Sequence, residues 1–218
     1  MYLPTQFAAQ DRAMARDLIL AQPLASLISN DEDGQPFVSH IPLHLVEGEP
    51  AQSAEWVLLG HVAKGNPHWR HLQARPSALV TFMGPQAFMS TRVYPDLVRV
   101  PTWNYLAVHC TVQASLIEAP QDKDRLLKTL IADHDPAYAA QWRSLGDDYA
   151  QRMLAAVVGF ELRITNLQCK IKLNQHRPES HAAMHALYAA GNADERALAH
   201  WMERLGLMDA AMTGPAAP

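Results

Sequence analysis

The run from residue 102 to residue 118 constrains the fold most, because it is dense in Thr, Trp, Tyr, Val, Cys and Ile. β-Branched and aromatic residues favour extended backbone, so this run predicts one long strand. Shorter β-prone runs precede it at residues 24–29, 37–46 and 56–63, and few of them alternate with helical segments. The sequence therefore predicts an α+β fold, a mostly antiparallel β-barrel with peripheral helices.

Turn-forming residues predict two hairpins in the first half of the chain. Residues 30–34 are dense in Asn, Asp and Gly and separate the runs 24–29 and 37–46. Gly84-Pro85 separates residues 77–83 from residues 87–93 in the same way.

Helical periodicity marks the remaining segments. An amphipathic helix is expected between Asp11 and Gln22, where Pro23 ends it, and a short helix after Asn66-Pro67. Alanine-rich helices near the C-terminus are separated by Gly191-Asn192. The expected organisation is a barrel domain over residues 1–178 with inserted helices around 120–155, a helical extension over 179–208 and a flexible tail over 209–218.

Composition excludes several classes of protein. Of the 218 residues, 49% are hydrophobic and 18% charged, which is typical of a globular chain, and no apolar stretch is long enough to span a membrane. The net charge of −4 gives no general attraction to nucleic acid. The two distant cysteines, Cys110 and Cys169, lie in apolar runs, which indicates free thiols and a cytoplasmic protein.

Three segments combine side chains suited to an anionic, aromatic ligand. Lys64 follows a strand directly before a helix start and is suited to a phosphate, although a solvated lysine is an equally simple interpretation. Residues 90–95 and 100–105 place hydroxyls, an amide and aromatic rings at strand ends, although a buried tryptophan would give the same pattern. Lys170 and Lys172 alternate along an extended segment and share one face.

The usual catalytic and metal motifs do not occur in the sequence. There is no GxGxxG, phosphate-binding P-loop, GxSxG or HExxH. His181 and His185 have helical i,i+4 spacing but no third ligand, so we assign no metal, and no residue is singled out as catalytic.

Six segments in order resemble the PaiB family of bacterial FMN-binding negative transcriptional regulators. They are Met-Tyr-x-Pro-x-x-Phe at residues 1–7, Gly-His-Val-Ala-Lys-x-Asn-Pro at 60–67, Met-Gly-Pro at 83–85 leading to Ser90, Val-Pro-Thr-Trp-Asn-Tyr at 100–105, Gly-Phe-Glu at 159–161, and Lys-x-Lys-Leu-x-Gln-x-Arg at 170–177. The resemblance extends from residue 1 to about residue 180, and the Pro-Thr-Trp-Asn-Tyr segment is the most specific.

The resemblance implies a split β-barrel of the flavin-reductase and pyridoxamine-oxidase type, with FMN bound in clefts of a homodimer interface. It implies a phosphate side, a ring side and a closing segment of the FMN site. The implied cofactor-binding residues are Ser39, His40, His61, Lys64, Asn66, Ser90, Arg92, Trp103, Asn104, Lys172, Gln175 and Arg177. Arg92 and His176 depart from the family pattern, and Arg92 adds a cation suited to phosphate.

The function implied by the resemblance is negative transcriptional regulation by an FMN-binding protein, so DNA is expected as a partner on this ground only. One alternative is a flavin-dependent oxidoreductase of the pyridoxamine-oxidase-like superfamily, so enzymatic activity stays open. Another is a haem-binding or haem-degrading split-barrel protein that uses His176, His181 or His185 as an axial ligand.

Overall fold

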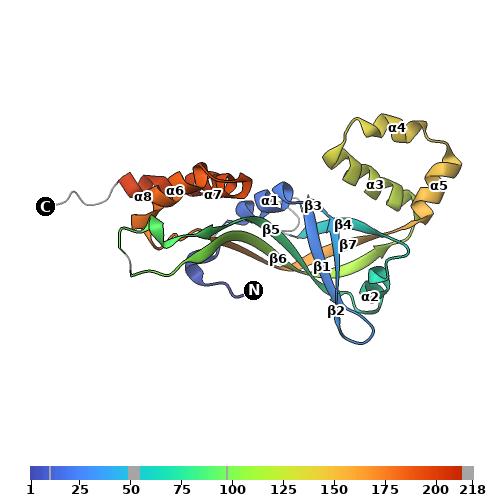
Figure 1. Ribbon diagram of the computed structural model, residues 1–218. Helices are drawn as coiled ribbons and strands as arrows, with labels where there is room; N and C mark the ends of the chain where they lie inside the picture. Colours follow the sequence, from blue (N-terminus) through green and yellow to red (C-terminus); the bar gives the residue numbers. More distant parts are fainter. Residues whose placement is uncertain (10, 49–54, 97, 213–218) are drawn as a thin grey trace. The chain divides into compact units, whose positions relative to one another are not determined.

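The computed structural model describes residues 1–9, 11–48, 55–96 and 98–212 (Figure 1). The chain divides into two compact units. Unit 1 comprises Met1–Ala15, Met83–Val108 and Gln168–Pro218, and unit 2 comprises Arg16–Phe82 and His109–Leu167.

The described residues form a seven-stranded sheet in the order β2-β1-β5-β6-β7-β4-β3. The strands are β1 (Leu24–Asn30), β2 (Pro36–Pro42), β3 (His44–Glu47), β4 (Trp56–Ala63), β5 (Ser77–Met89), β6 (Thr102–Ile117) and β7 (Val157–Lys172). β1 pairs antiparallel with β2 and β5, and β4 pairs antiparallel with β3 and β7. The long strand expected at residue 102 is confirmed as β6, and the α+β class is confirmed as well.

Eight α-helices accompany the sheet in the described part of the chain. They are α1 (Arg12–Ala21), α2 (His68–Ala74), α3 (Pro120–His134), α4 (Tyr138–Ser144), α5 (Asp147–Ala155), α6 (His181–Ala189), α7 (Ala193–Arg204) and α8 (Leu207–Met212). Three 3₁₀ turns, η1 (Thr5–Phe7), η2 (Thr91–Val93) and η3 (Pro178–Ser180), complete the elements. None of these helices has the length and apolar character needed to cross a membrane.

Unit 2 is organised by the alternation of side chains along β4. Every second residue from Trp56 to Val62 is buried, and the residues that alternate with them, Val57, Leu59 and His61, are half-buried. Gly60 lies opposite Phe160 of β7, and a Cβ at Gly60 would lie 3.0 Å from the Phe160 ring. The missing side chain therefore leaves room for the ring.

The helices α3, α4 and α5 form the inserted helical segment of unit 2, and α3 contacts both of the others. The buried face of α3 includes Leu126 and Leu130. A Cβ at Gly159 would lie only 2.7 Å from Leu126 Cδ2, so the glycine allows α3 to pack closely on the start of β7.

Unit 1 contains the C-terminal helices, and α6, α7 and α8 contact one another. α6 ends just before Gly191, as the sequence predicts. Asn192 then begins α7 with a capping box, in which its side chain accepts from Glu195 N and the Glu195 side chain accepts from Asn192 N. Such reciprocal caps satisfy backbone donors that a helix start leaves unpaired.

Two strand predictions were wrong. Residues 77–89 form the single strand β5 rather than a hairpin turning at Gly84-Pro85. β5 pairs with β1 only as far as Thr81. Pro85 lies beyond this pairing, so the N–H that proline lacks is not needed for a hydrogen bond to β1. The run 37–46 is likewise divided after Pro42, where β2 ends and β3 turns to pair with β4.

The helices expected around 120–155 are three, α3, α4 and α5, and Gly146 occupies the N-cap position of α5. Of the tail expected over 209–218, the first four residues belong to helix α8, which continues to Met212, and residues 213–218 lie outside the described residues.

Candidate functional site

A buried hydrogen-bond network joins β1, β2 and α2 in unit 2. Asn66 Nδ2 donates to Ser39 Oγ over 3.0 Å, and His68 Nδ1 lies 2.9 Å from the same oxygen. His68 Nε2 lies 3.0 Å from Ser29 Oγ. Asn66 Oδ1 also accepts from His68 N, which fixes the start of α2. The structure thus brings together two of the expected residues, Ser39 and Asn66. It joins them to Ser29 and His68, which the sequence did not single out.

His68 is neutral within this network. Its side chain is fully buried, and burial, followed by the charge of His71, lowers its pKa to about 4. Because Ser39 Oγ accepts from Asn66, its hydroxyl hydrogen is free to donate to His68 Nδ1, and Nε2 then carries the proton toward Ser29. The imidazole therefore fixes β1 and β2 relative to α2 without carrying charge.

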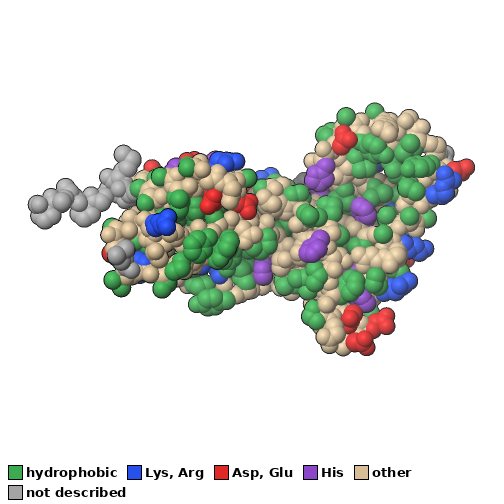
Figure 2. Space-filling view, in the orientation of Figure 1, with side chains coloured by type: hydrophobic (Ala, Val, Ile, Leu, Met, Phe, Trp, Pro, Cys, Tyr) green, Lys and Arg blue, Asp and Glu red, His purple; other side chains and the backbone are tan. Residues whose placement is uncertain are grey.

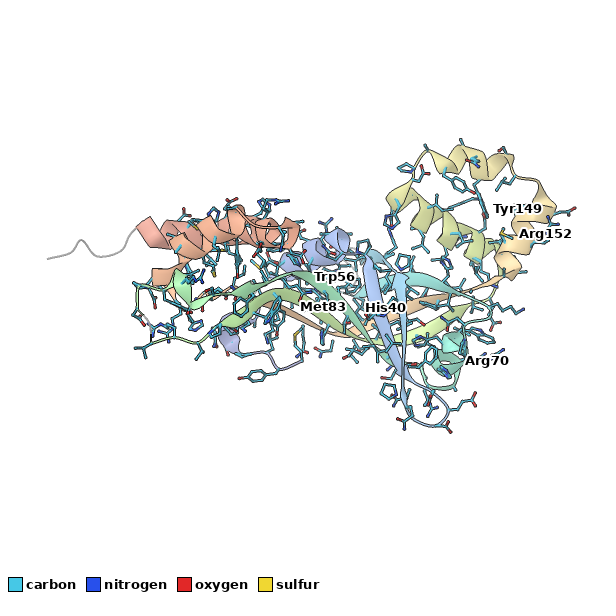
Figure 3. The ribbon with its side chains drawn as sticks, in the orientation of Figure 1. His40, Trp56, Arg70, Met83, Tyr149 and Arg152 are labelled. Atoms are coloured by element: carbon cyan, nitrogen blue, oxygen red, sulfur yellow. The ribbon has the colours of Figure 1, made fainter. Side chains whose placement is uncertain are left out.

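His40 and His61 lie apart from this network. His40 is exposed on β2, as Figure 3 shows, and its Nδ1 lies 3.0 Å from Ser26 Oγ of β1. His61 lies on β4, where burial lowers its pKa and its Nδ1 has no hydrogen-bond partner among the described residues. His61 is therefore a neutral group with one unused ring nitrogen.

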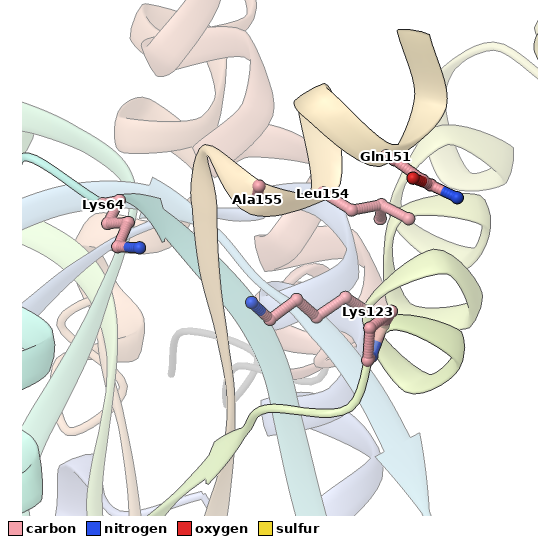
Figure 4. A pocket seen from close by; sticks show the side chains of 6 residues that line it. Lys64, Lys123, Gln151, Leu154 and Ala155 are labelled. Atoms are coloured by element: carbon pink, nitrogen blue, oxygen red, sulfur yellow. The ribbon is translucent and has the colours of Figure 1, made fainter. Parts of the chain in front are cut away.

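Lys64 lines a cavity of about 570 Å³ in unit 2 (Figure 4). The other lining residues come from the inserted helical segment, and they are Pro120, Lys123, Gln151, Leu154 and Ala155. Two cationic side chains and one amide thus line a cavity whose remaining walls are apolar.

Lys172, Asn104 and Arg177 line a second cavity, of about 230 Å³, in unit 1. Lys172 Nζ donates to Thr102 Oγ1 over 2.6 Å, and burial lowers the pKa of Lys172. No carboxylate of the described residues forms an ion pair with Lys172, so this charge is compensated only by the hydroxyl and the nearby Tyr105 ring. An anion would be favoured here.

Asn104 is fully buried at the inner side of this cavity in unit 1. Its Nδ2 lies 3.0 Å from the Tyr188 hydroxyl and within sulfur hydrogen-bond distance of Met89 and Met184. Its Oδ1 has no hydrogen-bond partner in the part of the chain that the structure describes. The amide therefore connects β6 to helix α6, and an unpaired buried acceptor of this kind costs stability.

The other expected residues of unit 1 lie in local structure. Ser90 Oγ caps η2 by accepting from Arg92 N, and the Arg92 side chain is exposed. The Gln175 side chain accepts from Leu173 N and donates to Ile171 O, so both ends of its amide group are engaged in local backbone hydrogen bonds. Trp103 is 53% exposed and is not the buried core residue that its sequence context also allowed.

The expected set therefore falls into a group in unit 2 and a group in unit 1. In unit 2 the structure links Ser39 directly with Asn66 and places Lys64 at a cavity, and in unit 1 it gathers Asn104, Lys172 and Arg177 around another cavity. Six expected residues lie outside these groups: His40, His61, Ser90, Arg92, Trp103 and Gln175. Sequence reasoning missed Ser29, His68, Lys123 and Gln151, of which only His68 stands beside a recognised motif, directly after Asn66-Pro67.

The histidines considered as haem ligands have competing partners. Both ring nitrogens of the buried His181 lie within hydrogen-bond distance of backbone carbonyls, those of Leu207 and Asn174. His185 Nε2 lies 2.8 Å from Glu203 Oε1, and the His176 ring packs edge-on against Phe7. Among the residues that the structure describes, no group of three or more His, Cys, Asp or Glu side chains is arranged to hold a metal ion.

Comparison with known proteins decides the family. Residues 1–166 match the family described as "Putative FMN-binding domain". The chain is also 30% identical over 183 residues to protease synthase and sporulation protein PAI 2 of Bacillus subtilis, covering 83% of this chain and 84% of the relative. The chain belongs to the PaiB family of FMN-binding proteins. An uncharacterized protein of Saccharomyces cerevisiae is 28% identical over 151 residues, covering 60% of this chain and 86% of that protein.

Solved structures confirm the PaiB-family chain as a split barrel. The flavocytochrome Anf3 from Azotobacter vinelandii superimposes with a TM-score of 0.61 at 19% identity, over 77% of this chain and 70% of that one. The FAD and heme binding protein from Mycobacterium smegmatis gives 0.59 at 22% identity, over 76% and 73%. At such identities the likeness shows the fold only, and FMN as the cofactor comes from the family match.

Proposed function

We propose that this FMN-binding protein is a cytoplasmic homodimer that acts as a negative transcriptional regulator of the PaiB type. The observation that carries the proposal is the relation to protein PAI 2 over most of both chains. A reducing compartment suits the two cysteines, because both are buried and neither is in a disulfide, and burial raises the pKa of Cys169 to about 12.

The phosphate side of the proposed flavin site includes Lys64, Asn66 and the exposed Arg92. A flavin phosphate carries close to two negative charges and needs cations or donors near it. The network through Ser39 and His68 supports this proposal, because it fixes the Asn66 side chain at the start of α2. His61 is proposed to contact the flavin through its unused ring nitrogen.

The ring side is proposed to include Trp103, Asn104, Ser90, Ser39 and His40. Trp103 supports this assignment because an exposed indole is suited to packing against a flat heteroaromatic ring. Lys172, Gln175 and Arg177 are proposed to close the site, and the missing carboxylate partner of Lys172 favours an anionic ligand there.

Exposed apolar side chains of unit 1 support the proposed homodimer. Phe88 and Trp103, on neighbouring strands, are each about half exposed, and their ring centroids lie 6.2 Å apart. Met83 is 47% exposed on the same strand as Phe88. Large apolar side chains gathered in this way are typical of surfaces that bind a partner or a ligand.

The first test is identification of the small molecule that copurifies with the protein. We expect a yellow protein with flavin absorption, and the mass of FMN after denaturation. Protein that is colourless as purified and takes up no added FMN would contradict the proposal.

The proposed role as a transcriptional regulator is tested by measuring binding to promoter DNA of the host genome. Binding is expected to be specific and to weaken as salt concentration rises, because phosphate contacts release counterions. The acidic side chains gathered at the tip of the β1–β2 hairpin, where Asp31, Glu32 and Asp33 lie, are not expected to contact DNA (Figure 2). Absence of DNA binding together with reduction of bound flavin by a nicotinamide cofactor would favour an oxidoreductase instead.

A further inference from the structure

The cavity of unit 2 that contains Lys64 is lined by a second lysine from a distant part of the sequence. Lys64 follows β4, and Lys123 lies in the first turn of α3. Figure 4 shows the two side chains extending toward each other, whereas the amide of Gln151 on α5 points away from them. The inserted helical segment therefore adds a cation to a place where the family motif supplies only one.

Among the described residues, the two lysines lack the carboxylate partners that Arg125 and Lys128 of α3 have. Neither Lys64 nor Lys123 forms an ion pair with a carboxylate among the described residues, whereas Lys128, one turn further along α3, pairs with Asp124. Of the residues that the structure describes, no acidic one lines the cavity. Two positive charges beside one cavity repel each other, so an anion between them would be favoured.

Backbone contacts hold both lysines at the junction between α5 and β7. Lys64 N donates to Ala156 O over 2.8 Å, and Lys123 Nζ donates to Val157 O over 3.2 Å. An ammonium group has three N–H donors, so Lys123 keeps two of them for a ligand. Leu154 is buried and forms an apolar wall of the cavity beside the two lysines.

We propose that this cavity receives the FMN phosphate, with Lys123 as a further phosphate-binding cation beside Lys64. This inference rests on the proposed flavin site. It assigns a binding role to the inserted helices α3 and α5, which the family motifs do not include.

The test compares FMN with riboflavin, which has the same ring and ribityl chain but no phosphate. Flavin affinities are measured by fluorescence quenching for the wild type, Lys123→Gln, Lys64→Gln and, as a matched control, Lys128→Gln. We expect Lys123→Gln and Lys64→Gln each to weaken FMN binding by roughly tenfold or more, with riboflavin affinity unchanged. Lys128→Gln is expected to bind both flavins as the wild type does. Lys123→Arg, which retains the charge, is expected to recover most of the FMN affinity.

The outcomes separate this inference from the proposed function. Wild-type protein that binds FMN while Lys123→Gln binds it equally well would overturn the role of Lys123 alone. Equal weakening of FMN and riboflavin would also overturn it, because the effect would then not depend on the phosphate. Failure of the wild type to bind either flavin would overturn the flavin site itself.

Discussion

Acidification from pH 6.5 to pH 4 is expected to destabilise the folded protein by about 3 kcal/mol through His68 alone. The folded-state pKa of about 4 lies below the ordinary value of 6.5, because burial disfavours the imidazolium. The unfolded chain therefore binds a proton first as the pH falls. The contribution of His68 is fully present above pH 6.5 and is lost as the pH falls toward 4. Urea unfolding at a series of pH values measures it.

Two variants show whether His68 is responsible. His68→Gln has no imidazole to titrate, so its free energy of unfolding should fall less steeply than that of the wild type between pH 6.5 and 4. His134 is exposed at the end of α3, and His134→Gln should retain the wild-type pH dependence. If His68→Gln loses free energy of unfolding as steeply as the wild type between pH 6.5 and 4, His68 is not the neutral, buried group described above.

Local patterns predicted those elements whose stability depends mainly on local residues. The long strand β6, the helix α1 before Pro23 and the stop at Gly191 all follow from propensity and capping. The single strand β5 was not predicted, because Gly84-Pro85 is a turn signal in most sequences. Here the strand continues through Gly84-Pro85, beyond its pairing with β1. Pairing between strands that are distant in sequence cannot be predicted from local patterns.

The candidate site was predictable in its motif residues but not in their partners. Asn66 and Lys64 belong to a recognisable segment, and the contact of Asn66 with Ser39 depends on the antiparallel pairing of β1 and β2. Lys123 carries no local signal, because lysines in the first turn of a helix are usually solvated. Only the packing of α3 on β7 brings Lys123 to the cavity of Lys64.

Phe160→Ala is expected to cost about 3–5 kcal/mol of folding free energy, because the ring is fully buried and fills the space opposite Gly60. Urea unfolding of the variant measures this loss. Val46→Ala is the matched control, since Val46 is 39% exposed on β3, and it should stay within about 0.5 kcal/mol of the wild type. A loss below about 1 kcal/mol in Phe160→Ala would contradict the packing of the ring against β4.

The pairing of Gly60 with Phe160 is tested separately by a double-mutant cycle. Gly60→Ala alone is expected to cost about 1–3 kcal/mol, because the new methyl group would crowd both Leu43 and the Phe160 ring. In the Phe160→Ala background the ring is gone, so the added methyl partly fills the cavity. The double variant should therefore lose less folding free energy than the sum of the losses of the two single variants. Strict additivity would mean that the ring and the glycine do not depend on each other, and that the close approach of β4 and β7 at this position has another cause.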